Sequence, residues 1–333
     1  IDWRDLRFEP FASPEVGKKL GEIAEDIRKA LQPAHTRSLI PHISIGRVPG
    51  LTRIHREKEG PTPPIVPSAE PDGDHDGAVP EPALATEPAT RIVDPMGRAD
   101  HITISEAIRE SDSGDRILVR PGLYQEGPVI DKPLEIIGDG DLEDIVVQAV
   151  GANAILFKTT MGRVVNPTLR QVGAGNWFCV NAIQGRLFLE DCDIGRQSLA
   201  CVAISGGADP RLLRNRIHDC KQSGVIVYES GLGNLEDNDI YGNSLSGVEI
   251  KTGADSVLHR NRIYENKEAG VYVYDGGQGR LDNNEIYRNA RAGMRIGNSG
   301  HPVLRRNRIN ANGIVAVWSP LKGGGDIENN DLR

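Results

Sequence analysis

Two groups of acidic residues in the C-terminal half are the first candidates for chemistry, because paired carboxylates break glycosidic bonds and clustered carboxylates hold calcium. The groups consist of Glu190, Asp191, Asp193, Glu236, Asp237 and Asp239. Arg214 and Arg216 lie between them along the chain. If the three segments stack, each carboxylate gains a guanidinium neighbour, which lowers its pKa. A lowered pKa suits neither a general acid nor a calcium cage, so we predict no catalytic residue, no metal site and no cofactor.

Aromatic residues offer a second kind of chemistry, because their rings bind the apolar faces of sugars and anchor protein interfaces. One set recurs every 23 residues and consists of His218, Tyr241, Tyr264 and Tyr287. The further candidates are Tyr228, Tyr272, Tyr274 and Trp318. We predict that these side chains form the binding surface. The alternative is that the regular set forms a self-stacking ladder, which stabilises the fold and binds no ligand.

The same interval governs the elements that must position these side chains. Asparagines recur every 23 residues, at Asn215, Asn238, Asn261, Asn284, Asn307 and Asn330. An apolar residue lies three positions before each of them and another lies two positions after. Short apolar segments of period two, separated by Asn, Gly and Asp, indicate strands and turns. So small a unit buries its apolar face only by stacking, so we predict a solenoid in which the asparagine amides hydrogen-bond as a ladder.

Two further columns keep step with the repeat. Glycines lie nine residues after the asparagines, at Gly224, Gly247, Gly270 and Gly293. We predict that they form tight corners with positive φ. Directly after the asparagine column, acidic and basic residues alternate from Asp193 to Asp331. Opposite charges one coil apart attract, so we predict ion pairs that fix the register. A charged stripe that binds a ligand is the alternative interpretation.

These units resemble a known family. Residues 235–254 (LEDNDIYGNSLSGVEIKTGA) and 258–277 (LHRNRIYENKEAGVYVYDGG) are similar to the right-handed parallel β-helix repeat. This pectin-lyase-like architecture includes carbohydrate-binding and sugar-hydrolysis domains of the NosD type. Residues 102–140 resemble its amphipathic cap and first coil. The resemblance implies an all-β, single-stranded right-handed parallel β-helix of about ten coils with an N-terminal capping helix. It leaves function open, because the family includes lyases, hydrolases, epimerases and non-catalytic recognition modules.

The chain divides into three parts by composition. Residues 1–50 indicate a small βα element, and within it residues 1–32 resemble the C-terminal end of a TIR-like signalling domain. We interpret the element as docked elsewhere or as the remnant of a larger domain. Residues 51–94 are rich in proline and predict a semi-extended linker. Residues 95–333 are the predicted β-helix. Because the last repeat lacks a distinct cap, we expect either further sequence or a cap formed by packing.

Composition limits the partners and the compartment. A net charge of −8 argues against nucleic-acid binding, which needs a basic surface. We find no apolar run of about 18 residues and no leader with a cleavage site, so we predict no membrane span and a cytoplasmic location. The cysteines lack metal-site spacing, and we predict buried free thiols, with disulfides as the alternative. They are Cys179, Cys192, Cys201 and Cys220.

These observations favour a non-catalytic recognition or scaffold module that binds a protein or glycan partner and is tethered to an effector or signalling part. The alternative is a carbohydrate-active enzyme of the polysaccharide lyase or epimerase type, which would need calcium. Self-association through the ends of the solenoid is a third interpretation, because an end without a cap exposes unpaired strand edges.

Overall fold

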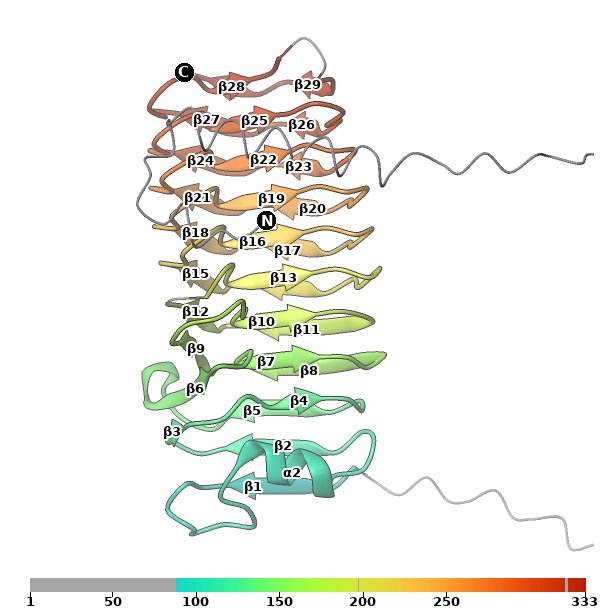
Figure 1. Cartoon of the computed structure of the whole chain (residues 1–333), viewed down its shortest axis with the longest axis vertical. Helices are drawn as coiled ribbons and strands as arrows, with labels where there is room; N and C mark the ends of the chain where they lie inside the picture. The colour runs from blue at the N-terminus through green and yellow to red at the C-terminus, as the bar shows by residue number, and fades with distance from the viewer. Residues whose placement is uncertain (1–87, 197, 321–322) are drawn as a thin grey trace, which may run out of the picture. The chain divides into compact units, whose positions relative to one another are not determined.

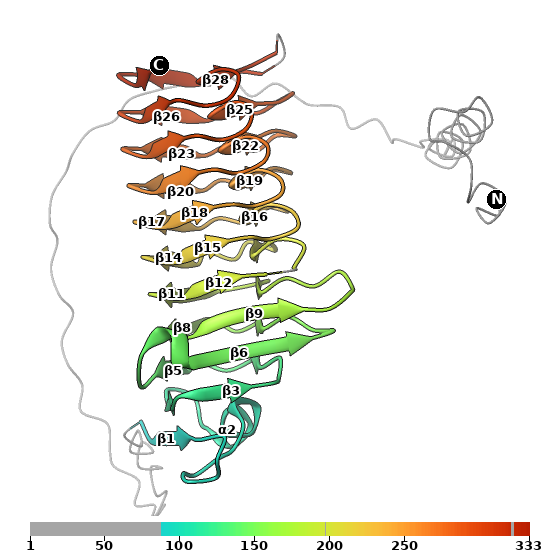
Figure 2. The same cartoon turned by 90° about the vertical axis from the view of Figure 1, so that its left-hand side faces the viewer.

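The chain winds into a parallel β-helix with three sheets along its sides (Figures 1 and 2). A computed structural model describes residues 88–196, 198–320 and 323–333. Sheet A has 11 strands, sheet B has 10 and sheet C has nine, and all of their pairings are parallel. A repeat of 23 residues contributes one strand to each sheet, in the order C, A, B. The predicted fold class is confirmed.

The strands are short, as the period-two segments predicted. Sheet A comprises β1 (Thr90–Val93), β2 (Arg116–Val119), β5 (Glu135–Gly138), β8 (Met161–Val165), β11 (Arg186–Glu190), β14 (Arg211–Leu213), β17 (Asn234–Glu236), β20 (Val257–His259), β23 (Arg280–Asp282), β26 (Val303–Arg305) and β29 (Asp326–Glu328). Sheet B comprises β3 (Gly122–Tyr124), β6 (Ile145–Val150), β9 (Thr168–Val172), β12 (Asp193–Gly195), β15 (Arg216–His218), β18 (Asp239–Tyr241), β21 (Arg262–Tyr264), β24 (Glu285–Tyr287), β27 (Arg308–Asn310) and β30 (Asp331–Leu332). Sheet C comprises β4 (Val129–Ile130), β7 (Ile155–Phe157), β10 (Val180–Ala182), β13 (Val202–Ile204), β16 (Val225–Val227), β19 (Val248–Ile250), β22 (Val271–Val273), β25 (Met294–Ile296) and β28 (Val317–Trp318).

An aliphatic core runs along the axis of the stack. Leu235, Ile240 and Val248 point inward from the three sheets and are fully buried. Each pairs with the equivalent residue of the next coil, as Leu235 does with Leu258. Because successive residues of a strand point to opposite faces, the residues beside them point outward. The fold therefore displays the outward columns of all three sheets at a spacing of about 4.8 Å per coil.

The predicted asparagine ladder is present at the corner between sheets A and B. The amide nitrogen of Asn238 donates to the side-chain oxygen of Asn261 at 2.9 Å and to the carbonyl of Leu212 at 2.9 Å. The Asn261 oxygen also accepts the backbone N–H of Asn238 at 3.0 Å. This pattern continues through the buried asparagines and satisfies amides that burial would otherwise leave unpaired. A second ladder with the same bonding lies at the corner before sheet C and comprises Asn243, Asn266, Asn289 and Asn312.

The prediction of positive φ for the glycine column is wrong. Gly224, Gly247, Gly270 and Gly293 are absent from the residues with positive φ. They are needed for space, because a Cβ at Gly247 would lie 2.8 Å from the amide nitrogen of Asn266 and 2.7 Å from the carbonyl oxygen of Gly270. Positive φ instead occurs just before the first asparagine ladder, for example at Asp237 and Arg260.

A helix covers the N-terminal end of the stack, as the resemblance implied. Helix α2 (Ile104–Glu110) packs on β1, β2 and β4 and buries Ile104, Ala107 and Ile108. The carboxylate of Glu126 accepts the backbone N–H groups of Ile104 and Ser105, both at 2.8 Å, which satisfies the open N-terminus of the helix. The short 3-10 helix η2 (Leu142–Asp144) lies before β6.

The boundaries at the N-terminal side shift slightly. Strand β1 lies within residues 51–94, which were predicted as linker, so the β-helix begins earlier than residue 95. The predicted βα element of residues 1–50, its TIR-like resemblance and the linker up to residue 87 lie outside the described residues. Where the structure describes the chain, its helices are too short and too polar to cross a membrane.

Candidate functional site

The predicted aromatic residues fall on two different faces. His218, Tyr241, Tyr264 and Tyr287 occupy one outward column of sheet B. Consecutive rings are stacked, with centroids 4.9, 5.1 and 5.0 Å apart and planes within 10° of parallel. Each inner ring therefore has both faces covered by its neighbours. This geometry matches the self-stacking alternative, since a sugar binds the face of a ring, not its edge.

Charged residues fix the N-terminal end of this ladder. The ring nitrogens of His218 lie 3.0 Å from the carboxylate of Asp193 and 2.8 Å from that of Asp219. Burial alone would lower the pKa of His218, but the hydrogen bonds to the two aspartates outweigh it and raise the pKa. Burial alone would raise the pKa of Asp193, but His218 and Arg170 lower it to about 2. Because both ring nitrogens bind carboxylates, this histidine is unsuited to be a general base.

The second aromatic group lines a groove on the outer face of sheet C. One column of this sheet runs through paired positions Ile226, Glu249, Tyr272, Arg295 and Trp318. The guanidinium of Arg295 lies 4.3 Å from the ring centroid of Tyr272 and 5.3 Å from that of Trp318. Arg295 therefore lies between two aromatic rings, one coil before it and one coil after. We call Tyr272, Tyr274, Arg295 and Trp318 the sheet C cluster.

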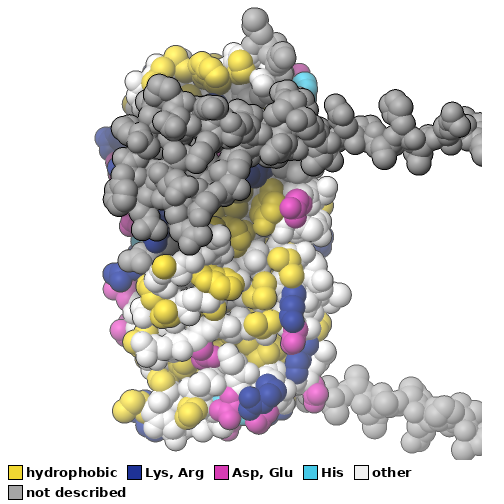
Figure 3. Space-filling view, in the orientation of Figure 1, with side chains coloured by type: hydrophobic (Ala, Val, Ile, Leu, Met, Phe, Trp, Pro, Cys, Tyr) yellow, Lys and Arg dark blue, Asp and Glu magenta, His cyan; other side chains and the backbone are white. Residues whose placement is uncertain are grey.

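Three adjoining hollows meet at Arg295. A hollow of about 390 Å³ extends toward Asn298 and Pro320, one of about 510 Å³ toward Glu249 and Glu268, and one of about 250 Å³ toward Ile314. Their lining combines aromatic faces with guanidinium and carboxylate groups. Figure 3 shows hydrophobic side chains spread over the middle and lower coils of this face and a row of charged side chains along its right-hand edge. Aromatic faces with a few polar groups are typical of ligand grooves.

A hydrogen bond and a neighbouring glycine fix the positions of the tyrosines in the groove. The Tyr274 hydroxyl lies 3.1 Å from the carboxylate of Glu249, which also accepts the Ser223 hydroxyl at 2.6 Å. Burial, followed by the charge of Glu249, raises the pKa of Tyr274. The rings of Tyr272 and Tyr274 stack with centroids 4.1 Å apart. A Cβ at Gly297 would lie 2.6 Å from the Cβ of Tyr274, so glycine is required beside this pair.

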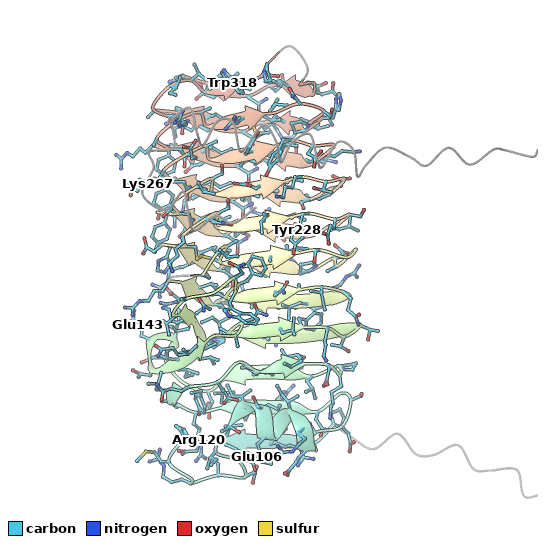
Figure 4. The ribbon with its side chains drawn as sticks, in the orientation of Figure 1. Glu106, Arg120, Glu143, Tyr228, Lys267 and Trp318 are labelled. Carbon is cyan, nitrogen blue, oxygen red and sulfur yellow. A yellow bond between two sulfur atoms is a disulfide. The ribbon has the colours of Figure 1, made fainter. Side chains whose placement is uncertain are left out.

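Tyr228 stands apart from the cluster. It follows β16, two coils before the equivalent Tyr274, and Lys251 occupies the coil between them. Figure 4 shows Tyr228 near the middle of the stack and Trp318 near its C-terminal end. The structure thus brings together Tyr272, Tyr274 and Trp318 from the predicted set.

The carboxylate clusters are paired with arginine, as predicted. Two nitrogens of Arg214 each lie 2.7 Å from an oxygen of Asp191, and two nitrogens of Arg260 each lie 2.8 Å from an oxygen of Asp237. The hydrogen bond from Arg260 lowers the pKa of Asp237. In the alternating column, Arg216 lies 2.7 Å from Asp193. Each of these carboxylates is therefore neutralised by an arginine of the next coil, as expected for ion pairs that fix the register of the stack.

The prediction of free thiols is wrong for one pair. Cys201 and Cys220 form a disulfide, whereas Cys179 and Cys192 are free and buried. The reason lies in the columns. In later coils a glycine faces an asparagine of the second ladder, and the two cysteines occupy these same two positions in the first such coil. Burial raises the pKa of Cys179 to about 11, so this thiol is unreactive.

Sequence reasoning missed Arg295, Glu249 and Gly297. Arg295 and Glu249 share the 23-residue column of Tyr272 and Trp318, so the signal was available in the sequence. It was obscured because the residue types in this column differ from coil to coil. The need for Gly297 appears only when the rings of the preceding coil are placed.

Comparison with known families assigns the fold. The family described as right handed beta helix region matches residues 153–280 and 200–332, which together span more than half of the chain. The chain therefore belongs to the right-handed β-helix family. A comparison with curated proteins finds no match.

Solved structures with the same fold include two carbohydrate-active enzymes. Pectate lyase Pel9A has 13% sequence identity and a TM-score of 0.52, covering 74% of this chain and 80% of that one. The A-module of the Azotobacter vinelandii mannuronan C-5 epimerase AlgE6 has 15% identity and a TM-score of 0.51, covering 68% and 71%. ORF18 of Geobacillus virus E2 has 11% identity and a TM-score of 0.50, covering 72% and 60%. At these identities the likeness concerns the fold alone.

Proposed function

We propose that this chain is a non-catalytic recognition module that binds an acidic glycan along the outer face of sheet C. The observation that carries the proposal is the position of Arg295 between Tyr272 and Trp318, at the meeting point of three hollows. Trp318 is 44% exposed and can offer a ring face to a sugar, whereas Tyr272 lies between Tyr274 and Arg295 and positions the guanidinium. That guanidinium can bind a carboxylate in a bidentate manner. A glycan laid along the column meets one side chain per coil.

The charge of Arg295 favours an acidic ligand. Within the described part of the chain, Arg295 has no ion pair with a carboxylate, whereas the neighbouring Arg291 lies 2.8 Å from Glu268. The guanidinium of Arg295 therefore keeps its hydrogen-bond donors for a ligand while the two rings hold its plane. Two structural neighbours are a pectate lyase and a mannuronan C-5 epimerase, and we therefore choose pectate and mannuronan as the acidic glycans to test.

The second candidate function is a polysaccharide lyase or epimerase, and the hydrogen bond between Tyr274 and Glu249 is the observation that favours it. Proton abstraction by a tyrosine requires a phenolate. The raised pKa of Tyr274 keeps the phenol protonated at neutral pH, so the hydroxyl is a donor and Glu249 is its acceptor. This pairing suits the positioning of Tyr274 better than catalysis, and for that reason we favour recognition.

Binding of the full chain to pectate, mannuronan and a neutral glucan, measured by isothermal titration calorimetry, tests the proposal. Tyr272→Ala and Trp318→Ala should each weaken binding to the acidic glycans about tenfold, and Arg295→Gln should do the same. The matched control is the triple variant of the sheet B ladder, Tyr241→Ala, Tyr264→Ala and Tyr287→Ala, which should bind normally if it folds.

Two results would overturn the proposal. One is unchanged affinity in the sheet C variants, and the other is loss of binding in a folded sheet B variant alone. Incubation of the chain with the same polymers, with and without calcium, tests the enzyme. Absorbance of unsaturated products, abolished by Glu249→Gln, would establish a lyase in place of a recognition module.

A further inference from the structure

A histidine and two glutamates converge at the N-terminal cap, away from the groove. His101, Glu106 and Glu110 each place one candidate ligand atom within 4.8 Å of those of the other two. Figure 4 shows Glu106 on the capping helix at the lower end of the stack. We propose that these three side chains bind a divalent transition-metal ion of the zinc class, which ties the capping helix to the first coil.

The local fold fixes the histidine and aligns the glutamates. The backbone N–H of His101 donates to the carbonyl of Ile92 at 3.1 Å, and its carbonyl accepts the N–H of Asp94 at 2.9 Å. His101 is therefore bound to the C-terminal end of strand β1 just before the helix begins. Glu106 and Glu110 are four residues apart on α2, so they lie on the same face of the helix.

The imidazole of His101 is buried without the hydrogen bonds that burial demands. The residue is only 6% exposed, and its Nε2 atom has no hydrogen-bond partner in the described residues. Its Nδ1 atom lies 3.9 Å from the nearest carboxylate oxygen, on Glu110, which is beyond hydrogen-bond distance. The metal-binding nitrogen is therefore Nδ1, which also makes no hydrogen bond within the described residues and is the ring nitrogen nearest the carboxylates. An unpartnered nitrogen of a buried imidazole beside two carboxylates selects a cation.

The donor set defines the class of metal. One imidazole nitrogen with two carboxylate oxygens suits zinc and similar borderline ions, whereas calcium and magnesium prefer oxygen ligands alone. Bonds of about 2.0 Å require the ligand atoms to approach more closely than they do here. The glutamates can move, because the side chain of Glu110 is 50% exposed and that of Glu106 is 35% exposed. Three protein ligands leave the fourth position to water.

Arg109 competes with a metal for the same carboxylates. Its Nη2 atom lies 3.7 Å from an oxygen of Glu106 and 3.6 Å from an oxygen of Glu110. The arginine side chain is mostly exposed, so it can leave toward solvent when the metal enters. Removal of this guanidinium should therefore tighten metal binding, a result that a purely structural ion-pair cluster would not give.

Zinc titration of the full chain by calorimetry tests the inference, with Co²⁺ as a spectroscopic probe of the ligand set. Wild type should bind one zinc ion at this site. Glu106→Gln and Glu110→Gln should each either lose this equivalent of zinc or bind it more than about tenfold more weakly. Arg109→Gln should strengthen binding. Glu143→Gln, which removes the same charge from an exposed position outside the cluster, is the control and should match wild type.

The histidine is tested separately because its removal opens a buried position. His101→Asn should lose the visible absorption of bound Co²⁺, and its fold is checked by circular dichroism. The two glutamine variants keep the test decisive if His101→Asn does not fold. Equal zinc affinity and stoichiometry in wild type, Glu106→Gln and Glu110→Gln would overturn the inference, as would weaker binding in Arg109→Gln.

Discussion

Gly297 lies directly beside Tyr274, so close that a Cβ added to the glycine would be 2.6 Å from the Cβ of the tyrosine. The same Cβ would lie 3.0 Å from the Tyr272 hydroxyl. The absence of one side chain in one coil therefore makes room for two rings of the coil before it. The 23-residue coils place their strands at equivalent positions, so this sequence difference between repeats shapes the groove.

Gly297→Ala is expected to displace the tyrosine pair. The added methyl group meets a Cβ atom that cannot rotate away, so the strand or the rings must shift. We expect a loss of about 1–3 kcal/mol in the free energy of unfolding, measured by chemical denaturation, together with weaker glycan binding. Asn298→Ala changes an exposed residue that lines the same hollow and should leave stability unchanged. Equal stability of Gly297→Ala and Asn298→Ala would contradict the packing argument.

Asn261→Ala is expected to be among the most destabilising single changes in the stack. Its amide nitrogen donates to the Leu235 carbonyl at 2.8 Å, and its oxygen accepts the backbone N–H of Asn238 at 3.0 Å. Removal of the side chain leaves both backbone groups buried without partners. At about 1–3 kcal/mol for each group, the free energy of unfolding should fall by about 2–6 kcal/mol. The comparison is Asn330→Ala at the more exposed end of the ladder, which should cost less in the same denaturation experiment.

The columns that could be read from the sequence are those in which the residue type repeats. The asparagine ladder, the alternating charges from Asp193 onward and the ring stack beginning at His218 all follow from the 23-residue interval. In each column the residue one coil away is of the same or a similar type, or carries the opposite charge. Stacking alone then places the asparagines and the rings in contact. In the charge column it gives the ion pairs of Arg216 with Asp193 and of Arg262 with Asp239.

Contacts between different columns were beyond the same reasoning. The disulfide of Cys201 and Cys220 depends on two columns meeting at one corner, and the interval alone does not show which columns meet. Likewise the site around Arg295 depends on residue types that change from coil to coil. In later coils a glycine faces an asparagine at the two positions that the cysteines occupy. This pairing is the one signal that links Cys201 to Cys220.

The disulfide leads to a redox prediction. Cys201→Gly combined with Cys220→Asn restores the glycine and asparagine pair of the later coils, so the variant should fold. Reduction should lower the free energy of unfolding of wild type by about 3 kcal/mol, the value for a loop of similar size, and should leave the double variant unchanged. Denaturation with and without dithiothreitol measures both. A reductant effect of the same size in the double variant would contradict the assignment to this disulfide.

His218 makes stability depend on pH. Asp193 and Asp219 raise its pKa in the folded chain against the opposing effect of burial, whereas the unfolded value is about 6.5. A group whose pKa is raised on folding contributes stability that is complete below the unfolded pKa and is lost as the pH rises through the folded value. Wild type should therefore lose stability in denaturant as the pH is raised from 6 to 9. His218→Tyr keeps a ring in the stack but does not carry this proton, so its stability should fall less over that range, and parallel curves for the two proteins would refute the assignment.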